Sequence, residues 1–407
     1  MNWGLEKELD AARNRYEDFL KEVKLSNAEL ASLLGVQPPP AQDIQALLDD
    51  DVTVLEYFTG EKVTYVWLVT KAGIKAFELQ AGDRAMDTKS ITTAVEGMLA
   101  MNITTRSRRP APVILLPTGE DSEATQAQRE QNRREFLKKT ESLYQTLITP
   151  VRQFITTKKL IIVPHGILHK VPFSCLSDGG KPLVEQYEIS TAPSLSAVEY
   201  VVKKRKKNNR KLIAFANPAT EKTNLAFAEK DVTDIGQLFP AREAFFKQDA
   251  TEGRAKQKAP EPDVIHFACH GEFNDRQPLQ SGLLLAGDRD NDGVLQVHEM
   301  FGLNLKQASL VTLSACETAL CRVRGGDDWA AMSRGLIYAG TPSILATLWS
   351  VEDKSTSMLM KSFYENWLQK GMSKPAALRQ AQLSLKSIPE YSHPYYWAPF
   401  VMIGDWR

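Results

Sequence analysis

Hydrophobic positions in the second half of the chain fall into short, continuous runs rich in β-branched residues. Such runs are typical of parallel strands that are buried on both faces of a sheet. Helical patterns separate them, and this alternation predicts an α/β fold with a mostly parallel sheet flanked by helices on both faces. The expected strands are 160–163, 212–216, 264–268, 310–313, 343–348 and 400–403. The expected helices are 194–204, 226–238, 329–339, 354–369 and 374–387.

The first half of the chain has a different pattern. Apolar and polar residues alternate over 52–57, 62–70 and 73–79, with turn residues between the runs, which predicts an antiparallel β-meander. Helices are expected at 42–48, 88–101 and 126–147, and a long amphipathic helix at 3–35 ends before the prolines at 38–40. We therefore expect a docking or linker helix at 1–40, an α/β half with the meander at 41–150, and the parallel-sheet unit at 151–407.

Composition narrows the choice of partners and compartment. Fifty basic and fifty acidic side chains cancel, so no global charge attracts nucleic acid or a membrane surface. The basic run at 203–211 lacks interleaved aromatic residues and is expected to be a solvated loop. The chain has no apolar run long enough to span a bilayer. Four cysteines without framework spacing favour the reducing cytosol, where a reactive thiol can persist.

Two of the expected strands end next to residues that could carry out covalent catalysis. The strand 264–268 is followed by His270 and Gly271, and the strand 310–313 is followed by Cys316. Active sites of open α/β sheets gather at the carboxyl ends of strands. If these strands are neighbours, the imidazole can take the proton of the thiol and activate it as a nucleophile. The backbone amides of Gly271 and Cys316 are then candidate oxyanion donors, since both are expected at turns without ladder partners.

The same residues have other interpretations. An isolated cysteine is more often a core residue than a nucleophile, and Cys269 is expected in the core. A zinc site is disfavoured, because His266 and His270 on one strand would lie about 13 Å apart. A turn or surface role is expected for His165 and His169 rather than a place in the site. No metal or cofactor is expected, and no phosphate-binding glycine loop is present.

Five motifs of the chain resemble those of the CHAT domain, a caspase-like cysteine peptidase family. They occur in the expected order over 150–407, and the segment 161–173 and the meander fit as well. The motifs are Phe267-Ala-Cys-His-Gly271, Leu313-Ser-Ala-Cys-Glu-Thr318, Gly335-Leu-Ile-Tyr-Ala-Gly340, Leu345-Ala-Thr-Leu-Trp-Ser-Val-Glu-Asp353 and His393-Pro-Tyr-Tyr-Trp-Ala-Pro-Phe-Val-Met-Ile-Gly404.

The resemblance implies a caspase-, separase- and gingipain-like fold, with residues 151–407 as the peptidase domain and 41–150 as a pseudo-caspase-like half. It implies a cysteine endopeptidase that cleaves protein substrates through a thioester acyl-enzyme, with His270 as base and then acid and Cys316 as nucleophile. The tetratricopeptide repeats that often precede this domain are not found in the chain. We therefore expect either a stand-alone enzyme or an activating or inhibitory sensor on another polypeptide, acting on the loop 317–328.

Specificity is a further expectation. The segment Trp349-Ser-Val-Glu-Asp-Lys354 resembles a loop of separase-type relatives in which an aspartate receives a basic substrate side chain, which would be Asp353. The alternative is that Asp353 caps a helix beginning at Lys354. Asp327 and Asp328 are alternative pocket carboxylates.

Two other functions stay open on the sequence. One is a non-catalytic caspase-like scaffold that binds partners, with the helix at 3–35 as its docking element. The other is an acyl transferase that uses the same dyad.

Overall fold

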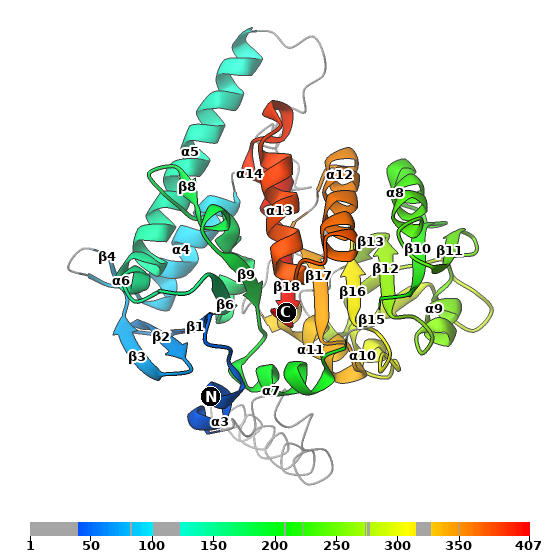
Figure 1. Cartoon of the computed structure of the whole chain (residues 1–407). Helices are drawn as coiled ribbons and strands as arrows, with labels where there is room; N and C mark the ends of the chain where they lie inside the picture. The colour runs from blue at the N-terminus through cyan, green and yellow to red at the C-terminus, as the bar shows by residue number, and fades with distance from the viewer. Residues whose placement is uncertain are drawn as a thin grey trace, which may run out of the picture.

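A single eleven-stranded sheet organises the molecule (Figure 1). The structure, a computed structural model, describes residues 40–81, 84–100, 123–206, 209–222, 224–272, 274, 277–314, 327–349 and 351–407. The expected helix at 3–35 lies outside these residues. One half of the sheet consists of five parallel strands, in the spatial order β11 (Ala241–Lys247), β10 (Lys211–Pro218), β12 (Val264–Ala268), β16 (Leu310–Leu313) and β17 (Ser343–Thr347).

The other half of the sheet runs in the opposite direction. Strand β18 (Phe400–Gly404) is antiparallel to β17, and β9 (Glu188–Thr191), β6 (Lys159–Val163) and β1 (Val52–Thr59) are parallel to β18. The expected meander completes this edge, with β2 (Thr64–Thr70) and β3 (Gly73–Glu78) each antiparallel to its neighbour. The mostly parallel sheet is confirmed, whereas the reversal between β17 and β18 was not predicted.

The reversal follows from the connection between β17 and β18. A single crossover helix returns the chain to the edge that it started from, so the next strand is parallel. Here two long helices intervene, α12 (Asp353–Tyr364) and α13 (Lys374–Lys386), followed by the short α14 (Pro394–Trp397). The second helix brings the chain back to the edge at which β17 ended, and the Leu348 amide donates a hydrogen bond to the Pro399 carbonyl oxygen at 2.9 Å.

Helices cover both faces of the sheet, as expected (Figure 1). One face carries α8 (Ala226–Gly236), α12 and α13, with α4 (Thr88–Leu99) and α5 (Glu123–Leu147) packed toward the meander edge. The other face carries α7 (Leu195–Lys204), α9 (Glu252–Lys258), α10 (Val297–Met300) and α11 (Asp327–Ala339). Short helices α3 (Ala41–Leu47) and α6 (Thr149–Arg152) precede β1 and β6.

Three short strands near the parallel half were not predicted, and neither were β9, β11, α9 and α10. Strand β13 (His270–Glu272) pairs with β14 (Gly282–Leu284), and β14 pairs with β15 (Val294–Gln296), which makes a small antiparallel sheet beyond the end of β12. The other half of the molecule contains two separate two-stranded sheets. One pairs β4 (Gln80–Ala81) with β5 (Arg84–Ala85), and the other pairs β7 (Ser177–Asp178) with β8 (Lys181–Pro182). Among the described helices, none combines the length and the apolar character that a membrane crossing requires.

Candidate functional site

The two strands that lead to His270 and Cys316 are neighbours in the sheet. Strands β12 and β16 are parallel, with Val264 opposite Leu310 and Phe267 opposite Leu313. One residue further on, the Ser314 amide donates a hydrogen bond to the Phe267 carbonyl oxygen at 2.8 Å. Cys316 follows two residues later, in the segment 315–326, which lies outside the described residues. The two chain segments thus leave the sheet side by side at the same edge.

Side-chain alternation along β12 determines which face each candidate residue occupies. Val264 and Ala268 pack against the α8 and α12 face, whereas Ile265, Phe267 and Cys269 pack against the α9, α10 and α11 face. Cys269 is fully buried there, which confirms that it is a core residue. The alternation arises because successive side chains of a strand point to opposite faces.

His266 lies deep on the α8 and α12 face. It is fully buried, and its Nδ1 is 3.2 Å from the Tyr364 hydroxyl, which is itself 2.7 Å from the Thr312 hydroxyl. Burial lowers the pKa of His266 to about 3, so this imidazole is neutral over the physiological pH range. His266, Tyr364 and Thr312 therefore form a buried polar cluster within the core. His270, four residues later, lies nearer the surface.

His270 is partly exposed and begins β13. It lies opposite Leu284, and Gly271 lies opposite Leu283, in an antiparallel ladder. The expectation that Gly271 occupies a turn without a ladder partner is wrong, because the chain turns only after β12 and then pairs again with β14. Residue pairs in such a ladder alternate between hydrogen-bonded and non-hydrogen-bonded pairs. The pairing of Gly271 with Leu283 therefore does not show whether the Gly271 amide bonds to β14 or faces a ligand.

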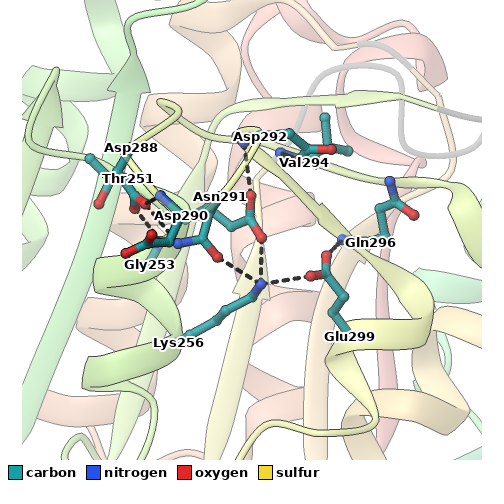
Figure 2. Close-up of polar contacts among 12 residues, drawn as sticks. Thr251, Gly253, Lys256, Asp288, Asp290, Asn291, Asp292, Val294, Gln296 and Glu299 are labelled. Carbon is teal, nitrogen blue, oxygen red and sulfur yellow. Dashed lines mark hydrogen bonds and ion pairs between the residues drawn. The ribbon is translucent and has the colours of Figure 1, made fainter.

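A network of charges fixes the loop that joins β14 to β15 (Figure 2). Lys256 Nζ of α9 lies 2.6 Å from Glu252 Oε1, 2.6 Å from Glu299 Oε1 and 3.0 Å from Asn291 Oδ1. Glu252 is 1% exposed, and its other oxygen accepts a hydrogen bond from the Gly293 amide at 2.8 Å. The network ties the loop to α9 and α10 and so supports β14, against which His270 is paired.

The sequence of this loop also carries a recognisable spacing of acidic residues. The spacing from Asp288 through Asp290, Asp292 and Gly293 to Glu299 is that of the EF-hand calcium loop. Gly293 has a φ of +93°, which favours glycine. In the structure the Lys256 ammonium lies against the last carboxylate of this pattern, and no three metal-binding side chains converge anywhere among the described residues.

Asp353 lies close to the same edge of the sheet, and its role differs from the cap considered above. Helix α12 begins at Asp353, and the residue before it, Glu352, is the N-cap, because its carboxylate accepts a hydrogen bond from the Ser355 amide at 2.6 Å. The Asp353 carboxylate instead accepts a hydrogen bond from the Phe227 amide of α8 at 3.0 Å. The prediction that Asp353 caps the helix is therefore wrong.

A small pocket connects Asp353 to the ends of β12 and β16. It lies between α8 and α12, has a water-accessible volume of only about 10 Å³, and its lining includes Ala268, Ser314, Asp353 and a second carboxylate, Asp231. Burial raises the pKa of Asp353, and the hydrogen bond from the Phe227 amide partly offsets this rise. The nearby charge of Glu352 raises the pKa of Asp353 further, whereas that of His270 lowers it. Asp353 and His270 are thus close enough to interact electrostatically.

The remaining candidates divide between the described and undescribed parts of the chain. Asp327 and Asp328 begin α11, and their side chains lie outside the described residues, as does Cys321. His165 is exposed and bonds to Thr59, with 2.8 Å between Nδ1 and Oγ1, in agreement with a turn role. His169 is buried, so a surface role for it is wrong. Both histidines follow β6, whose carboxyl end lies at the sheet edge opposite to that of β12.

Comparison with known proteins agrees with this arrangement. The CHAT domain profile matches residues 137–405, more than half of the chain. Tetratricopeptide repeat protein 28 from Homo sapiens is 23% identical over 323 residues, covering 65% of this chain and 13% of that protein. The Mus musculus protein of the same name is 32% identical over 133 residues, covering 33% of this chain and 5% of that protein. The chain thus spans only a small part of these relatives.

A solved structure shares the fold at low sequence identity. The separase in the Saccharomyces cerevisiae separase–securin complex superposes with a TM-score of 0.59 at 10% identity, over 89% of this chain and 30% of that chain. This likeness confirms the caspase-like sheet with helices on both faces that the motifs implied. The chain belongs to the CHAT domain family.

Proposed function

We propose that this protein is a cysteine endopeptidase with Cys316 as nucleophile and His270 as general base. The observation that carries the proposal is the pairing of β12 with β16, up to the hydrogen bond from the Ser314 amide to Phe267. His270 and Cys316 lie two residues beyond Ala268 and Ser314, respectively, so both chain segments begin from the same point of the sheet edge. Neighbouring parallel strands bring residues at their carboxyl ends together.

The proposed reaction proceeds through a thioester. His270 takes the Cys316 proton, and the thiolate sulfur attacks the scissile carbonyl carbon. The tetrahedral intermediate collapses, the carbon–nitrogen bond breaks, and the leaving amine takes the proton from His270. A water molecule then attacks the thioester with His270 as its base, and the Cys316 sulfur leaves and regains a proton. The products are a carboxylic acid and an amine, and no cofactor takes part.

The developing oxyanion needs hydrogen-bond donors near the nucleophile. We assign the backbone amides of Gly271 and Cys316 to this role, because the former directly follows the base and the latter belongs to the nucleophile itself. Gly271 is buried beside His270 in β13, and its pairing with Leu283 of β14 fixes the position of the backbone there. Removal of one such donor typically costs a factor of about 10²–10³ in rate.

The Asp353 carboxylate beside the site leads us to propose a basic residue before the cleaved bond. Asp353 is half-buried, lines the pocket with Ser314, and is not used as a helix cap. A carboxylate in this position favours arginine or lysine. Asp327 and Asp328 are alternative carboxylates for the same side chain, since α11 begins directly after the segment that contains Cys316.

Regulation by another protein is part of the proposal. The matched relatives are named for tetratricopeptide repeats, and this chain corresponds to a small part of their length. We propose that a repeat-containing or other sensor protein controls access to the dyad, with the loop 317–328 as the responding segment. A reducing, cytoplasmic compartment would keep the Cys316 thiol reactive.

Selective labelling and cleavage together test the proposal. The purified chain is treated with a thiol-reactive activity probe and screened on a peptide library, beside Cys316→Ala, Cys321→Ala and His270→Ala. The proposal expects Cys316 to be labelled in preference to Cys321, and cleavage to vanish in Cys316→Ala but persist in Cys321→Ala. Undiminished cleavage by Cys316→Ala would contradict it. Labelling without selectivity would favour the scaffold, and amide exchange without hydrolysis would favour the acyl transferase.

A further inference from the structure

The buried polar cluster of His266, Thr312 and Tyr364 joins the two strands that lead to the proposed dyad. His266 of β12 and Thr312 of β16 are register partners. The hydroxyl of Tyr364, from α12, lies 3.2 Å from His266 Nδ1 and 2.7 Å from Thr312 Oγ1. His266 and Thr312 each precede a member of the dyad by four residues, His270 and Cys316 respectively. The Tyr364 hydroxyl therefore bridges the two strands at equivalent positions.

The cluster distinguishes the observed register of β12 and β16 from a register shifted by two residues. Such a shift keeps every side chain on its own face, because successive residues of a strand alternate between faces. The backbone does not make the distinction either, since the hydrogen bonds of a parallel pair are evenly spaced. The shift would place His266 opposite Leu310 or Ser314. The Tyr364 hydroxyl could then no longer bond to both strands, and a buried polar group without a partner is unfavourable.

Aromatic contacts hold the Tyr364 ring in place. Its centroid lies 5.8 Å from that of Phe239 and 5.1 Å from that of Phe363, both in edge-on contacts, and 6.1 Å from that of Trp367. Burial raises the pKa of Tyr364, so its hydroxyl stays protonated. A π-helical turn, Glu365–Gln369, begins directly after Tyr364. Such turns are rare and are frequent at functional sites.

We propose that Tyr364 is a positioning residue for the dyad, because its hydroxyl holds β12 and β16 in the register from which His270 and Cys316 extend. The inference rests on the proposed peptidase function and adds to it a residue of α12 that touches neither substrate nor nucleophile. A displacement of about 1 Å between reacting groups can lower a rate about 10²-fold. The register of the two strands is therefore expected to matter for the rate of the reaction.

Tyr364→Phe removes the hydroxyl and keeps the ring, so it isolates the bridge. His266 Nε2 has no hydrogen-bond partner among the described residues, so the variant deprives this imidazole of the polar contact that Tyr364 supplies. The packing against the neighbouring aromatic rings is retained. We therefore expect Tyr364→Phe to fold, with strand ends that are held less firmly.

Alkylation of Cys316 by iodoacetamide tests the role without relying on catalysis. The rate is followed against pH by mass spectrometry in the full chain, in Tyr364→Phe and in His270→Ala. We expect the wild-type midpoint to lie below the ordinary cysteine pKa of about 8.5, and the Tyr364→Phe midpoint to shift toward that of His270→Ala. In peptide cleavage by Tyr364→Phe, kcat should fall about tenfold or more with KM unchanged.

Tyr57→Phe is the matched control. Tyr57 belongs to the same hydrophobic core, and its hydroxyl donates a hydrogen bond to the Leu147 carbonyl oxygen at 2.9 Å. It lies on β1, in the other half of the sheet. Thermal unfolding should show similar losses of melting temperature in Tyr57→Phe and Tyr364→Phe. Only Tyr364→Phe should change the alkylation midpoint and kcat.

Variants of Thr312 test the other end of the bridge. Thr312→Val removes the hydroxyl at nearly constant shape and should shift the alkylation midpoint as Tyr364→Phe does. Because both variants break the same bridge, the double variant should shift the midpoint no further than either one alone. Thr312→Ser, which keeps a hydroxyl, should recover most of the shift.

The outcomes separate the positioning role from the proposed peptidase function. An unshifted midpoint in both Tyr364→Phe and Thr312→Val would overturn the positioning role. An equal shift in Tyr57→Phe would overturn it too, since a general loss of stability would then be the cause. A wild-type profile that coincides with that of His270→Ala would instead contradict the dyad, and the positioning role would be lost with it.

Discussion

The Ser314 amide donates a hydrogen bond to the Phe267 carbonyl oxygen at 2.8 Å. This contact extends the pairing of β12 with β16 beyond the last ladder pair, Phe267 and Leu313. It fixes the point at which the two chain segments leave the sheet, directly after Ala268 of one strand and at Ser314 of the other. A rigid strand end is a more reliable support for catalytic groups than a long loop.

The first prediction separates the two acidic residues at the start of α12. Glu352→Ala removes the N-cap carboxylate that accepts from the Ser355 amide and should lower the free energy of unfolding by about 1 kcal/mol. Asp353→Asn keeps that cap and should change stability less, while reducing cleavage after arginine by a factor of about 10² or more. Urea denaturation and peptide kinetics on both variants measure the two effects. If Asp353→Asn lost more stability than Glu352→Ala, Asp353 rather than Glu352 would be the cap of α12.

The second prediction concerns the stability contribution of Asp231. Because its pKa is raised by burial and by Asp353, the protonated form favours folding, and stability is lost as the pH rises above the ordinary aspartate value of about 4. Asp231→Asn should therefore be more stable than the wild type at pH 7, by about 1.4 kcal/mol for each pKa unit of the shift. The difference should disappear below about pH 4.

Chemical denaturation over a range of pH measures this difference, with Asp234→Asn as the matched control on α8. Asp234 is paired with Lys230 at the surface, so its substitution should give a small change of about 0–1 kcal/mol. A wild type that is more stable than Asp231→Asn at pH 7 would mean that Asp231 is ionised and well compensated in the ligand-free chain.

The third prediction concerns the network that supports β13. Lys256→Met leaves the buried Glu252 carboxylate without its ammonium and should destabilise the fold by about 2–3 kcal/mol. Lys258→Met, on the same helix but paired with the more exposed Glu243 and Glu261, should change the stability much less, because solvent screens these ion pairs. Denaturation curves of the two variants, with Lys256→Met/Glu252→Gln as a partial rescue, test the assignment. Equal losses from both lysines would refute it.

The sequence was sufficient to predict the central strands because each is buried on both faces and therefore reads as an apolar run. Strands β12 and β16 were located to the residue. Strand β11 was missed because it forms the edge of the sheet, where its polar and charged side chains reach solvent. The strands β13 to β15 have three residues each, too few to produce a periodic pattern.

Tertiary contacts explain a further difference. The basic run after α7 was expected to be solvated, yet Lys204 Nζ donates to the carbonyl oxygens of Ile337 and Tyr338, and Lys206 Nζ donates to that of Gly340. These carbonyls lie at or directly after the end of α11, where the negative end of the helix dipole favours cations. Arg205 pairs with the buried Asp405 at 2.7 Å. No local pattern identifies such partners, because they lie more than 130 residues away.

The two pocket carboxylates, Asp353 and Asp231, could also not both be identified from the local sequence. Asp353 was a candidate from its motif, and the sequence left its capping role open, since helix boundaries shift by one residue without a clear local signal. Asp231 was not a candidate, because a single acidic residue in an amphipathic helix is usually exposed. Its burial becomes evident only when α8 packs against α12 over the ends of β12 and β16.

The most direct test of the account is the rate at which iodoacetamide alkylates Cys316 as a function of pH, read by mass spectrometry in the wild type and in His270→Ala. An imidazole beside the thiol should stabilise the thiolate, so the wild-type profile should have its midpoint below the ordinary cysteine pKa of about 8.5. In His270→Ala the midpoint should return to about 8.5 and the rate at pH 7 should fall about tenfold or more. Profiles that coincide in the two proteins would contradict the dyad.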